Sequence, residues 1–274
     1  MADQGAGGLR IAIAGLGAIG MAVARRLDAG IDGLALSAVA ARDLDRARAR
    51  VAGFRAPPEV VESPRLAELG EVVVECAPAA AFREIAGPAL AAGRILVAAS
   101  AAALLVHPDL VDHARERGGR IIVPTGALLG LDAVRAAAEG EISSVTMVTR
   151  KPPASLAGAP YLAEKGIRLD RLNGPLKVFD GSARDGARGF PANVNVAAAL
   201  SLAGIGADRT RLEIWADPAL TRNTHHIEVE ADSARLSMTI ENVPSAENAR
   251  TGRITALSIV AALRRLVSPL TVGT

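Results

Sequence analysis

The sequence is poor in cysteine and in aromatic residues, and each shortage excludes a class of protein. Cys76 is the only cysteine, which excludes a disulfide-stabilised fold and a cysteine-based zinc site, and we predict no metal. Aromatic residues make up only 2% of the chain, too few for a surface that stacks sugars or single-stranded nucleic acid. The 31 basic and 29 acidic residues nearly cancel, with no Lys/Arg run suited to phosphates, so we expect no nucleic-acid partner.

Long apolar runs are also missing. No uninterrupted apolar stretch reaches the roughly 18 residues of a membrane-spanning helix, so we expect no membrane span. Residues 1–8 are polar and glycine-rich and do not resemble a signal peptide, which makes the cytoplasm the default location. Half of the 274 residues are apolar and 22% are charged, which is enough for one large domain or two modest ones.

Short apolar runs alternate with helical patterns in the first half of the chain. The strand candidates are Arg10–Ala14, Leu34–Ala41, Val72–Cys76, Ile95–Ala99 and Ile121–Val123. The helix candidates between them are Ala18–Ala29, Asp43–Ala52, Ala79–Ala92 and His107–Arg117. This alternation is typical of parallel βαβ units, so residues 1–126 are predicted to form an α/β domain with a Rossmann-type, doubly wound parallel sheet.

The pattern changes after Gly126. Helices are predicted at Leu128–Glu139 and Ala192–Ala203, and strands at Ser144–Thr149, Arg211–Trp215, His226–Glu230 and Arg235–Ile240. The last two strands alternate apolar and polar residues, which favours a mainly antiparallel sheet with one face covered. We therefore predict a second α+β domain at 127–243, with the helix of segment 244–274 packing back on the first domain.

A glycine motif follows the first predicted strand and opens the first predicted helix. Gly15-Leu16-Gly17-Ala18-Ile19-Gly20 fits GxGxxG, a pattern that 27 glycines could produce by chance without this context. Gly15 allows a tight turn, Gly17 lets the backbone approach a diphosphate, and Gly20 permits close packing of helix on strand. The motif predicts NAD or NADP binding; the alternative is a glycine turn in a plain α/β protein.

The ends of the later strands indicate the rest of the cofactor site. The second strand ends without an acidic residue for the ribose 2′-hydroxyl, and Arg42 stands there instead. Arg42 could pair with the 2′-phosphate of NADP, stack on adenine, or be a solvated surface residue, while Asp43 could cap the next helix. Cys76 and Ala77 follow another strand and are expected beside the nicotinamide half of the pocket, with Cys76 a packing residue rather than a nucleophile.

Motifs of the second half resemble those of the L-aspartate dehydrogenase family, in order and over almost the whole chain. They are Pro124–Ala127, Gly130–Ala133, Thr149–Pro153, Phe190–Ala198, Arg222–His225, Glu241–Ser245 and Thr251–Ser258. The resemblance implies NAD(P)-dependent, reversible oxidation of L-aspartate to iminoaspartate, which hydrolyses to oxaloacetate and ammonia or feeds pyridine-nucleotide (NAD) biosynthesis. It also implies that His225 is the catalytic acid/base and that Ala127 and Asn195 contact the cofactor. The family commonly has an acidic residue after this histidine, where His226 stands here.

The chemistry of the residues agrees with a histidine at this place. Hydride leaves an amino acid only when the amine is neutral, so a base is needed, and an imidazole titrates near neutral pH. Strand alternation places His225 and His226 on opposite faces, so only one of them can face the substrate. A dicarboxylate also needs cations, for which Arg150 and Lys151 are candidates, although an exposed basic pair beside a proline turn is equally consistent with the sequence.

Two asparagines before a predicted helix complete the candidates. Asn193 and Asn195 are two residues apart, and we expect one to cap the helix while the other meets the nicotinamide carboxamide. Asn193 is also a candidate for substrate binding. The alternatives to an aspartate dehydrogenase are a homoserine-dehydrogenase-like or dihydrodipicolinate-reductase-like enzyme, or a dinucleotide-binding regulator without turnover. An edge or face of the second sheet is expected to be covered by another copy, in a homo-oligomer such as a dimer.

Overall fold

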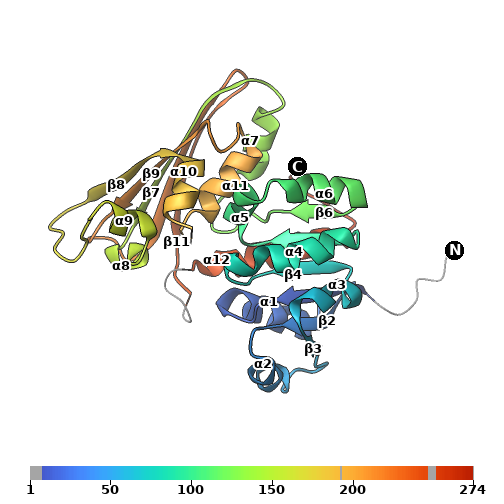
Figure 1. Cartoon of the computed structure of the whole chain (residues 1–274). Coiled ribbons are helices and arrows are strands. Elements are labelled where there is room, and N and C mark those ends of the chain that lie inside the picture. The colour runs from blue at the N-terminus through green and yellow to red at the C-terminus, as the bar shows by residue number, and fades with distance from the viewer. Residues whose placement is uncertain (1–7, 192, 246–250, 274) are drawn as a thin grey trace. The chain divides into compact units, whose positions relative to one another are not determined.

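The computed structural model describes residues 8–191, 193–245 and 251–273. The described chain forms two compact units (Figure 1), which are residues 8–124 with 256–271, and residues 125–255 with 272–273. Most of the glycine-rich start, and Ala192 at the head of a predicted helix, lie outside the described residues.

The first unit is built on a six-stranded sheet in the order β3-β2-β1-β4-β5-β6, in which each pair of neighbours is parallel. The strands are β1 (Leu9–Ala14), β2 (Leu34–Ala40), β3 (Glu59–Val61), β4 (Val72–Glu75), β5 (Ile95–Ala98) and β6 (Arg120–Ile122). The order reverses between β1 and β4, which is the switch point at which doubly wound sheets bind ligands. The predicted Rossmann-type parallel sheet is confirmed, with β3 as a strand that the sequence did not reveal.

Helices cover both faces of this sheet (Figure 1). They are α1 (Ala18–Asp28), α2 (Leu44–Val51), α3 (Leu66–Leu69), α4 (Phe82–Ala91), α5 (Ala101–Val106), α6 (Asp109–Arg117) and α12 (Arg253–Arg265), with 3-10 turns η1 (Ser63–Arg65) and η2 (Ala79–Ala81). Successive β4 residues enter different cores: Val74 packs with Met21 of α1 and Leu263 of α12, while Val73 packs with Phe82 of α4. Burial of each such side chain contributes about 1.5–3 kcal/mol.

The second unit contains a five-stranded sheet in the order β11-β10-β7-β9-β8. Its strands are β7 (Ile142–Lys151), β8 (Leu176–Ser182), β9 (Thr210–Ala216), β10 (Asn223–Ala231) and β11 (Arg235–Asn242). The pair β7–β9 is parallel and the other three pairs are antiparallel, so the prediction of a mainly antiparallel sheet is confirmed.

Short helices accompany this second sheet. They are α7 (Leu131–Ala137), α8 (Pro153–Leu156), α9 (Pro160–Glu164), α10 (Ala183–Gly189) and α11 (Asn195–Ala203). Both α10 and α11 lie against β9, and three rings pack edge-on or tilted beside them at 5.3–5.7 Å between centroids: Tyr161, Phe179 and Phe190. This packing leaves one face of the sheet buried, and the candidate catalytic side chains lie on that face.

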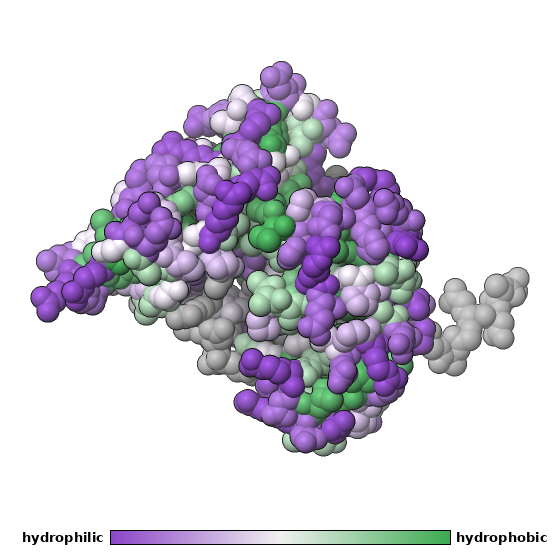
Figure 2. Space-filling model, in the orientation of Figure 1, coloured by the Kyte–Doolittle hydropathy of each residue, from purple (hydrophilic) through white to green (hydrophobic). Residues whose placement is uncertain are grey.

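Figure 2 shows hydrophilic side chains over most of the visible surface, with smaller hydrophobic areas between them. The most strongly exposed large apolar side chains are Val106, at the end of α5, and Leu270 and Val272, in the segment after α12. Scattered apolar residues of this kind are usual on a protein surface.

Candidate active site

The glycine turn of the first unit has the geometry that the motif predicts. Gly15 has φ +91°, and a Cβ there would lie 2.7 Å from the carbonyl oxygen of Cys76. A Cβ on Gly20 would lie 1.9 Å from the carbonyl oxygen of Gly15, so helix and turn are in close contact. A Cβ on Gly17, in contrast, would meet nothing within 4 Å. The turn is therefore tight on its protein side and open at Gly17.

Helix α1 begins at this opening. Its N-cap, Gly17, offers no side chain to the first-turn amides, and no acidic residue lies in that turn. Arg50 of α2 donates a hydrogen bond to the carbonyl oxygen of Leu16 and so holds the turn from outside. Unpaired amides at the positive end of a helix, with no side chain above them, suit a diphosphate. The residues present therefore fit the diphosphate of a dinucleotide.

The end of β2 carries one basic residue that is available to a ligand. The Asp43 carboxylate accepts a hydrogen bond from the backbone N–H of Arg46 at 2.9 Å, so Asp43 caps α2 as predicted. Arg42 is exposed and makes no hydrogen bond or ion pair with another described residue. Its guanidinium is thus free to meet a 2′-phosphate.

A buried carboxylate lies where β4 ends. Glu75 is fully buried, and its oxygens accept from the N–H of Ala77 at 3.0 Å and from the N–H and hydroxyl of Ser100 at 2.9 and 3.0 Å. Burial raises the pKa of Glu75 to about 7, against the lowering effect of these donors. Burial, and then the neighbouring Glu75, raise the pKa of Cys76 well above its usual value, so the thiol is a packing group and not a thiolate nucleophile.

The second unit brings His225 together with a partner on the neighbouring strand. His225 of β10 lies opposite Thr149 of β7, and the Thr149 hydroxyl is 3.1 Å from Nδ1 of the ring. Only 2% of His225 is exposed. Burial, and then the charge of Lys151, lower the pKa of His225 to about 3, so the ring is neutral at physiological pH. Thr149 occupies Nδ1 and leaves Nε2 as the nitrogen for a substrate.

Lys151 lies two residues beyond Thr149 and therefore on the same face of β7. It is 5% exposed, and its ammonium donates to the backbone carbonyl and the side-chain oxygen of Asn193 at 3.0 and 3.1 Å. Burial lowers the pKa of Lys151 to about 8. Neither acceptor carries a charge, so this buried cation has no anion beside it among its described partners, and a ligand carboxylate would compensate it.

The other two candidates of this region lie on the opposite face. Arg150 is exposed, its guanidinium stands 5.2 Å from the ring centroid of Trp215, and it lies 3.8 Å from the carboxylate of Asp217. The Nδ1 atom of His226 is 2.8 Å from the hydroxyl of Thr239. The structure therefore groups His225 with Lys151 and separates both from Arg150 and His226.

The asparagines before α11 do not act as predicted at the helix start. The N-cap of α11 is Val194, without a side-chain hydrogen bond, so the prediction that an asparagine caps this helix is wrong. The reason is that Asn193 turns its side-chain oxygen to the Lys151 ammonium instead. Asn195 is the first residue of α11 and is partly buried. The backbone carbonyl oxygen of Ala127 accepts a hydrogen bond from the side-chain NH2 group of Asn242 at 3.0 Å.

Three residues of the site had no assigned role in the sequence: Glu75, Thr149 and Asn242. Thr149 and Asn242 belong to motifs shared with the resembled family, which was the only available signal. Their contacts join residues 76 and 115 positions apart in the chain, which spacing alone does not reveal. Glu75 is an acidic residue at the end of an otherwise apolar strand, and that pattern could have drawn attention to it.

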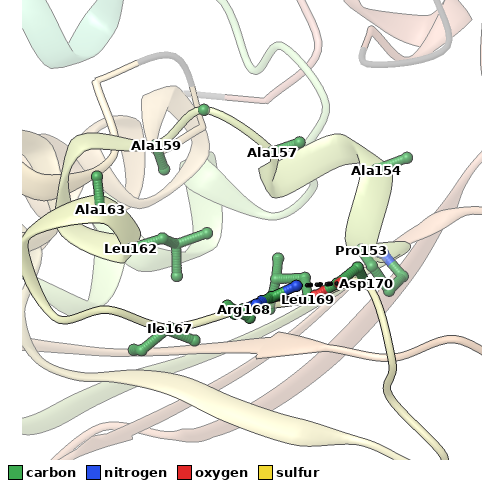
Figure 3. Close-up of a pocket in the computed structure, with 11 residues that line it drawn as sticks. Pro153, Ala154, Ala157, Ala159, Leu162, Ala163, Ile167, Arg168, Leu169 and Asp170 are labelled. Atoms are coloured by element: carbon green, nitrogen blue, oxygen red, sulfur yellow. Dashed lines mark hydrogen bonds and ion pairs between the residues drawn. The ribbon is translucent and has the colours of Figure 1, made fainter.

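A pocket of about 500 Å³ lies elsewhere in the second unit, between α8, α9 and the segment that follows them (Figure 3). Small apolar side chains line it, together with the ion pair of Arg168 and Asp170 at 2.8 Å. None of the predicted site residues lines this pocket. Among the described residues, no three His, Cys, Asp or Glu side chains are grouped to hold a metal ion, and no helix is long and apolar enough to cross a membrane.

Comparison with known proteins places these features in one family. A family model described as the C-terminal domain of aspartate dehydrogenase matches residues 132–266, and a model of the NAD binding domain of homoserine dehydrogenase matches residues 15–124. L-aspartate dehydrogenase of Bradyrhizobium diazoefficiens is 58% identical over 275 residues, covering 100% of this chain and 98% of the relative. L-aspartate dehydrogenase 3 of Bordetella bronchiseptica is 55% identical, covering 97% of this chain and 98% of the relative.

Solved structures agree on the fold. The crystal structure of aspartate dehydrogenase from Thermotoga maritima matches with a TM-score of 0.76 at 24% identity, covering 97% of this chain and 99% of that one. A hyperthermophilic archaeal homoserine dehydrogenase in complex with NADPH matches with a TM-score of 0.56 at 14% identity, covering 95% and 98%. The identity over the full length of both chains, rather than this shared fold, shows that the chain belongs to the L-aspartate dehydrogenase family.

Proposed function

We propose that this protein is an NAD(P)-dependent L-aspartate dehydrogenase, which converts L-aspartate reversibly to iminoaspartate. Iminoaspartate then hydrolyses to oxaloacetate and ammonia. The observation that carries the proposal is the buried, neutral His225 beside the buried cation Lys151, in a chain that is 58% identical to an L-aspartate dehydrogenase. One side chain suits the substrate nitrogen and the other suits a carboxylate.

His225 is proposed as the acid/base. In the oxidative direction the substrate ammonium must lose a proton before its Cα hydrogen can leave with the bonding electrons. For Nε2 of the neutral ring to accept that proton, the ring hydrogen must be on Nδ1, which lies 3.1 Å from the Thr149 hydroxyl. The carboxylates of the substrate oppose the charge of Lys151, which lowers the pKa of His225 in the free protein, and so they raise the basicity of the ring.

Lys151, rather than Arg150, is proposed to bind a substrate carboxylate. Lys151 shares a face with His225 and has only the neutral oxygens of Asn193 as partners, whereas Arg150 lies on the other face against Trp215. Asn193 orients the ammonium and offers its own amide to the substrate. An ammonium held in a buried site gives a carboxylate a stronger partner than one in water.

The cofactor is NAD or NADP, and the nicotinamide, when bound, accepts the hydride from the substrate. The open turn from Gly15 through Gly17 to Gly20, with the amides of Ala18 and Ile19, would hold the diphosphate. Arg42 would pair with the 2′-phosphate of NADP. Cys76 and Ala77 would line the nicotinamide half, and the resemblance assigns cofactor contacts to Ala127 and Asn195.

An assay of the reverse reaction tests the proposed activity. Purified protein with oxaloacetate, ammonium and either NADPH or NADH is expected to consume the reduced cofactor, which its absorbance reports. Pyruvate, 2-oxoglutarate and aspartate semialdehyde are tested separately as alternative substrates, since related two-domain dehydrogenases share this architecture. Faster turnover of any of them than of oxaloacetate would contradict the proposed substrate.

We also propose an oligomeric state and a cellular setting for the enzyme. Strand β11 lies at the edge of the second sheet, and an edge strand is a common place for a second copy to pair, so we propose a homodimer. Light scattering of the purified protein tests this. A cytoplasmic location and a supply of iminoaspartate to pyridine-nucleotide biosynthesis are proposed from the family resemblance.

A further inference from the structure

The buried carboxylate of Glu75 has no place in the proposed chemistry, yet it joins two loops of the first unit. It lies at the carboxyl end of β4 and accepts hydrogen bonds from the loop that follows β4 and from the loop that follows β5. One donor is Ala77, just after β4; the other two belong to Ser100, between β5 and α5. Ser100 is the N-cap of α5, but its hydroxyl turns to Glu75 instead of capping its own helix.

The loop after β4 is in turn packed against the glycine turn. A Cβ on Gly15 would lie 2.7 Å from the Cys76 carbonyl oxygen and 2.9 Å from the Ala77 Cα, and a Cβ on Gly20 would lie 3.4 Å from the Cys76 Cβ. The backbone N–H of Cys76 donates to Ala14 just before the turn, at 2.8 Å. A displacement of residues 76–78 would therefore move the wall of the dinucleotide site.

The order of the strands tells which half of a dinucleotide these loops face. In the order β3-β2-β1-β4-β5-β6, the adenosine half belongs on the β2 side of the glycine turn and the nicotinamide half on the β4 and β5 side. Glu75 lies on the β4 and β5 side. Both loops that it joins are therefore next to the nicotinamide half.

We propose that Glu75 is a positioning residue for the nicotinamide half of the cofactor, because its carboxylate holds the loops after β4 and β5 in one arrangement. The inference rests on the use of NAD(P) in the proposed function. Burial of an ionisable group is costly unless it is fully hydrogen-bonded, and here each carboxylate oxygen faces at least one donor. The printed donors to Glu75 are all neutral; on the neighbouring helices, Arg83 and Glu84 of α4 are exposed, and α5 contains no ionisable residue.

Glu75→Gln tests this with little change of shape. A carboxamide has one oxygen and one NH2 group, so one of the two oxygen positions would present a donor to a donor, and one loop would be released. The readout is the dissociation constant of two ligands measured without substrate: NADH, and ADP-ribose, which lacks the nicotinamide. NADPH and 2′-phospho-ADP-ribose replace them if the protein prefers NADP. We expect the affinity for NADH to fall about tenfold, as for loss of one charged hydrogen bond, and the affinity for ADP-ribose to change less than about twofold.

Glu71→Gln is the matched control. Glu71 precedes β4 at the other end of the same strand and is only partly buried, and its carboxylate accepts a solvent-exposed hydrogen bond from the backbone N–H of Arg10 at 3.1 Å. This variant also loses a carboxylate bonded to an amide, but we expect both ligands to bind as they do to the wild type. If Glu75→Gln does not fold, Ser100→Ala removes only the hydroxyl donor and should show the same split between the ligands at a few-fold.

Each outcome decides the proposal. Equal weakening of both ligands, or of neither, in a folded Glu75→Gln or Ser100→Ala variant would overturn it, because a merely structural role does not distinguish the nicotinamide. Wild-type protein that binds neither dinucleotide would overturn the cofactor assignment and this inference together. Normal binding with the expected split, but no turnover of oxaloacetate, would contradict the proposed substrate and leave the role of Glu75 standing.

Discussion

The two units build their functional parts from different material. The first unit uses its backbone. Gly15 and Gly20 leave no room for a side chain, whereas Gly17 at the start of α1 has open space beside it. The second unit uses buried ionisable side chains with displaced pKa values, His225 and Lys151. Even the buried charge of the first unit, Glu75, is met by three donors of its own unit, whereas the charge of Lys151 meets only neutral oxygens. We therefore expect the glycine turn of the first unit to respond to added volume, and the His225 and Lys151 pair of the second unit to respond to changes of charge.

The largest effect is expected at His225. His225→Ala should lower the turnover of oxaloacetate and ammonium by a factor on the order of 10² or more, because the acid/base group is lost. The affinity for the reduced cofactor should stay as in the wild type, since His225 is proposed to act on the substrate and has no proposed contact with the cofactor. Steady-state rates and cofactor titration measure the two quantities.

His226→Ala is the control for this prediction. His226 is the next residue along β10, on the opposite face, where it contacts Thr239. Its removal should leave turnover within about twofold of the wild type, as is usual for a substitution on a partly exposed surface. A large loss in His226→Ala with an active His225→Ala would reverse the assignment of the two imidazoles.

Lys151 should show the next largest effect. Loss of its ammonium is expected to raise the KM for oxaloacetate roughly thirtyfold or more in Lys151→Met, as for removal of one member of a buried charge pair. In the wild type, kcat/KM for oxaloacetate should fall above about pH 8, because the pKa of Lys151 is lowered to about 8 and only the ammonium binds a carboxylate. Arg150→Met decides between the two cations. If Arg150→Met raises the KM for oxaloacetate and Lys151→Met does not, the substrate carboxylate binds on the opposite face of β7.

Lys151→Met should also be more stable than the wild type. A lysine whose pKa falls from 10.5 to about 8 on folding destabilises the folded state below about pH 8, and this cost disappears as the pH rises toward 10.5. Lys151→Met keeps the apolar stem without the charge. Its free energy of unfolding at pH 7 should therefore increase by up to about 3 kcal/mol, measured by urea denaturation. Lys165→Met, at an exposed lysine, provides the control without this gain.

Added volume tests the first unit. Gly17→Ala places a methyl group where nothing lies within 4 Å, so the fold should keep its stability, but the methyl stands where a diphosphate would approach. We expect the affinity for the reduced cofactor to fall about tenfold, about as much as loss of one charged hydrogen bond would cost. Gly20→Ala is the comparison, since its Cβ would lie 1.9 Å from a backbone oxygen and should lower the melting temperature. Equal melting temperatures and unchanged cofactor affinity in both variants would contradict the geometry of the turn.

The sequence predicted the first unit better than the second, for physical reasons. A buried parallel strand is apolar along its whole length, and a GxGxxG turn between a strand and a helix is typical of a dinucleotide site. These local patterns were therefore sufficient to predict the sheet and the turn of the first unit. Strand β3 has only three residues and strand β8 reads LKVFDGS, without clear alternation, and both were missed. The strand predicted to stop at Thr149 continues through Lys151, so the opposite faces of Arg150 and Lys151 could not be assigned beforehand. The contact of Thr149 with His225 depends on register between strands far apart in the chain, which no local pattern specifies.

The smallest effect is expected at Arg42, the charged side chain of the first unit that is proposed to contact the cofactor directly. Arg42 is exposed, so its interaction with a 2′-phosphate is weakened by water and salt. Arg42→Ala should weaken NADPH binding a few-fold at low ionic strength and leave NADH binding unchanged. Arg48→Ala is the control, because Arg48 is equally exposed but already paired with Asp45 at 2.6 Å. If NADH and NADPH weaken together in Arg42→Ala, the guanidinium stacks on adenine instead of pairing with phosphate, and the first unit then recognises its ligand without reading charge at this position.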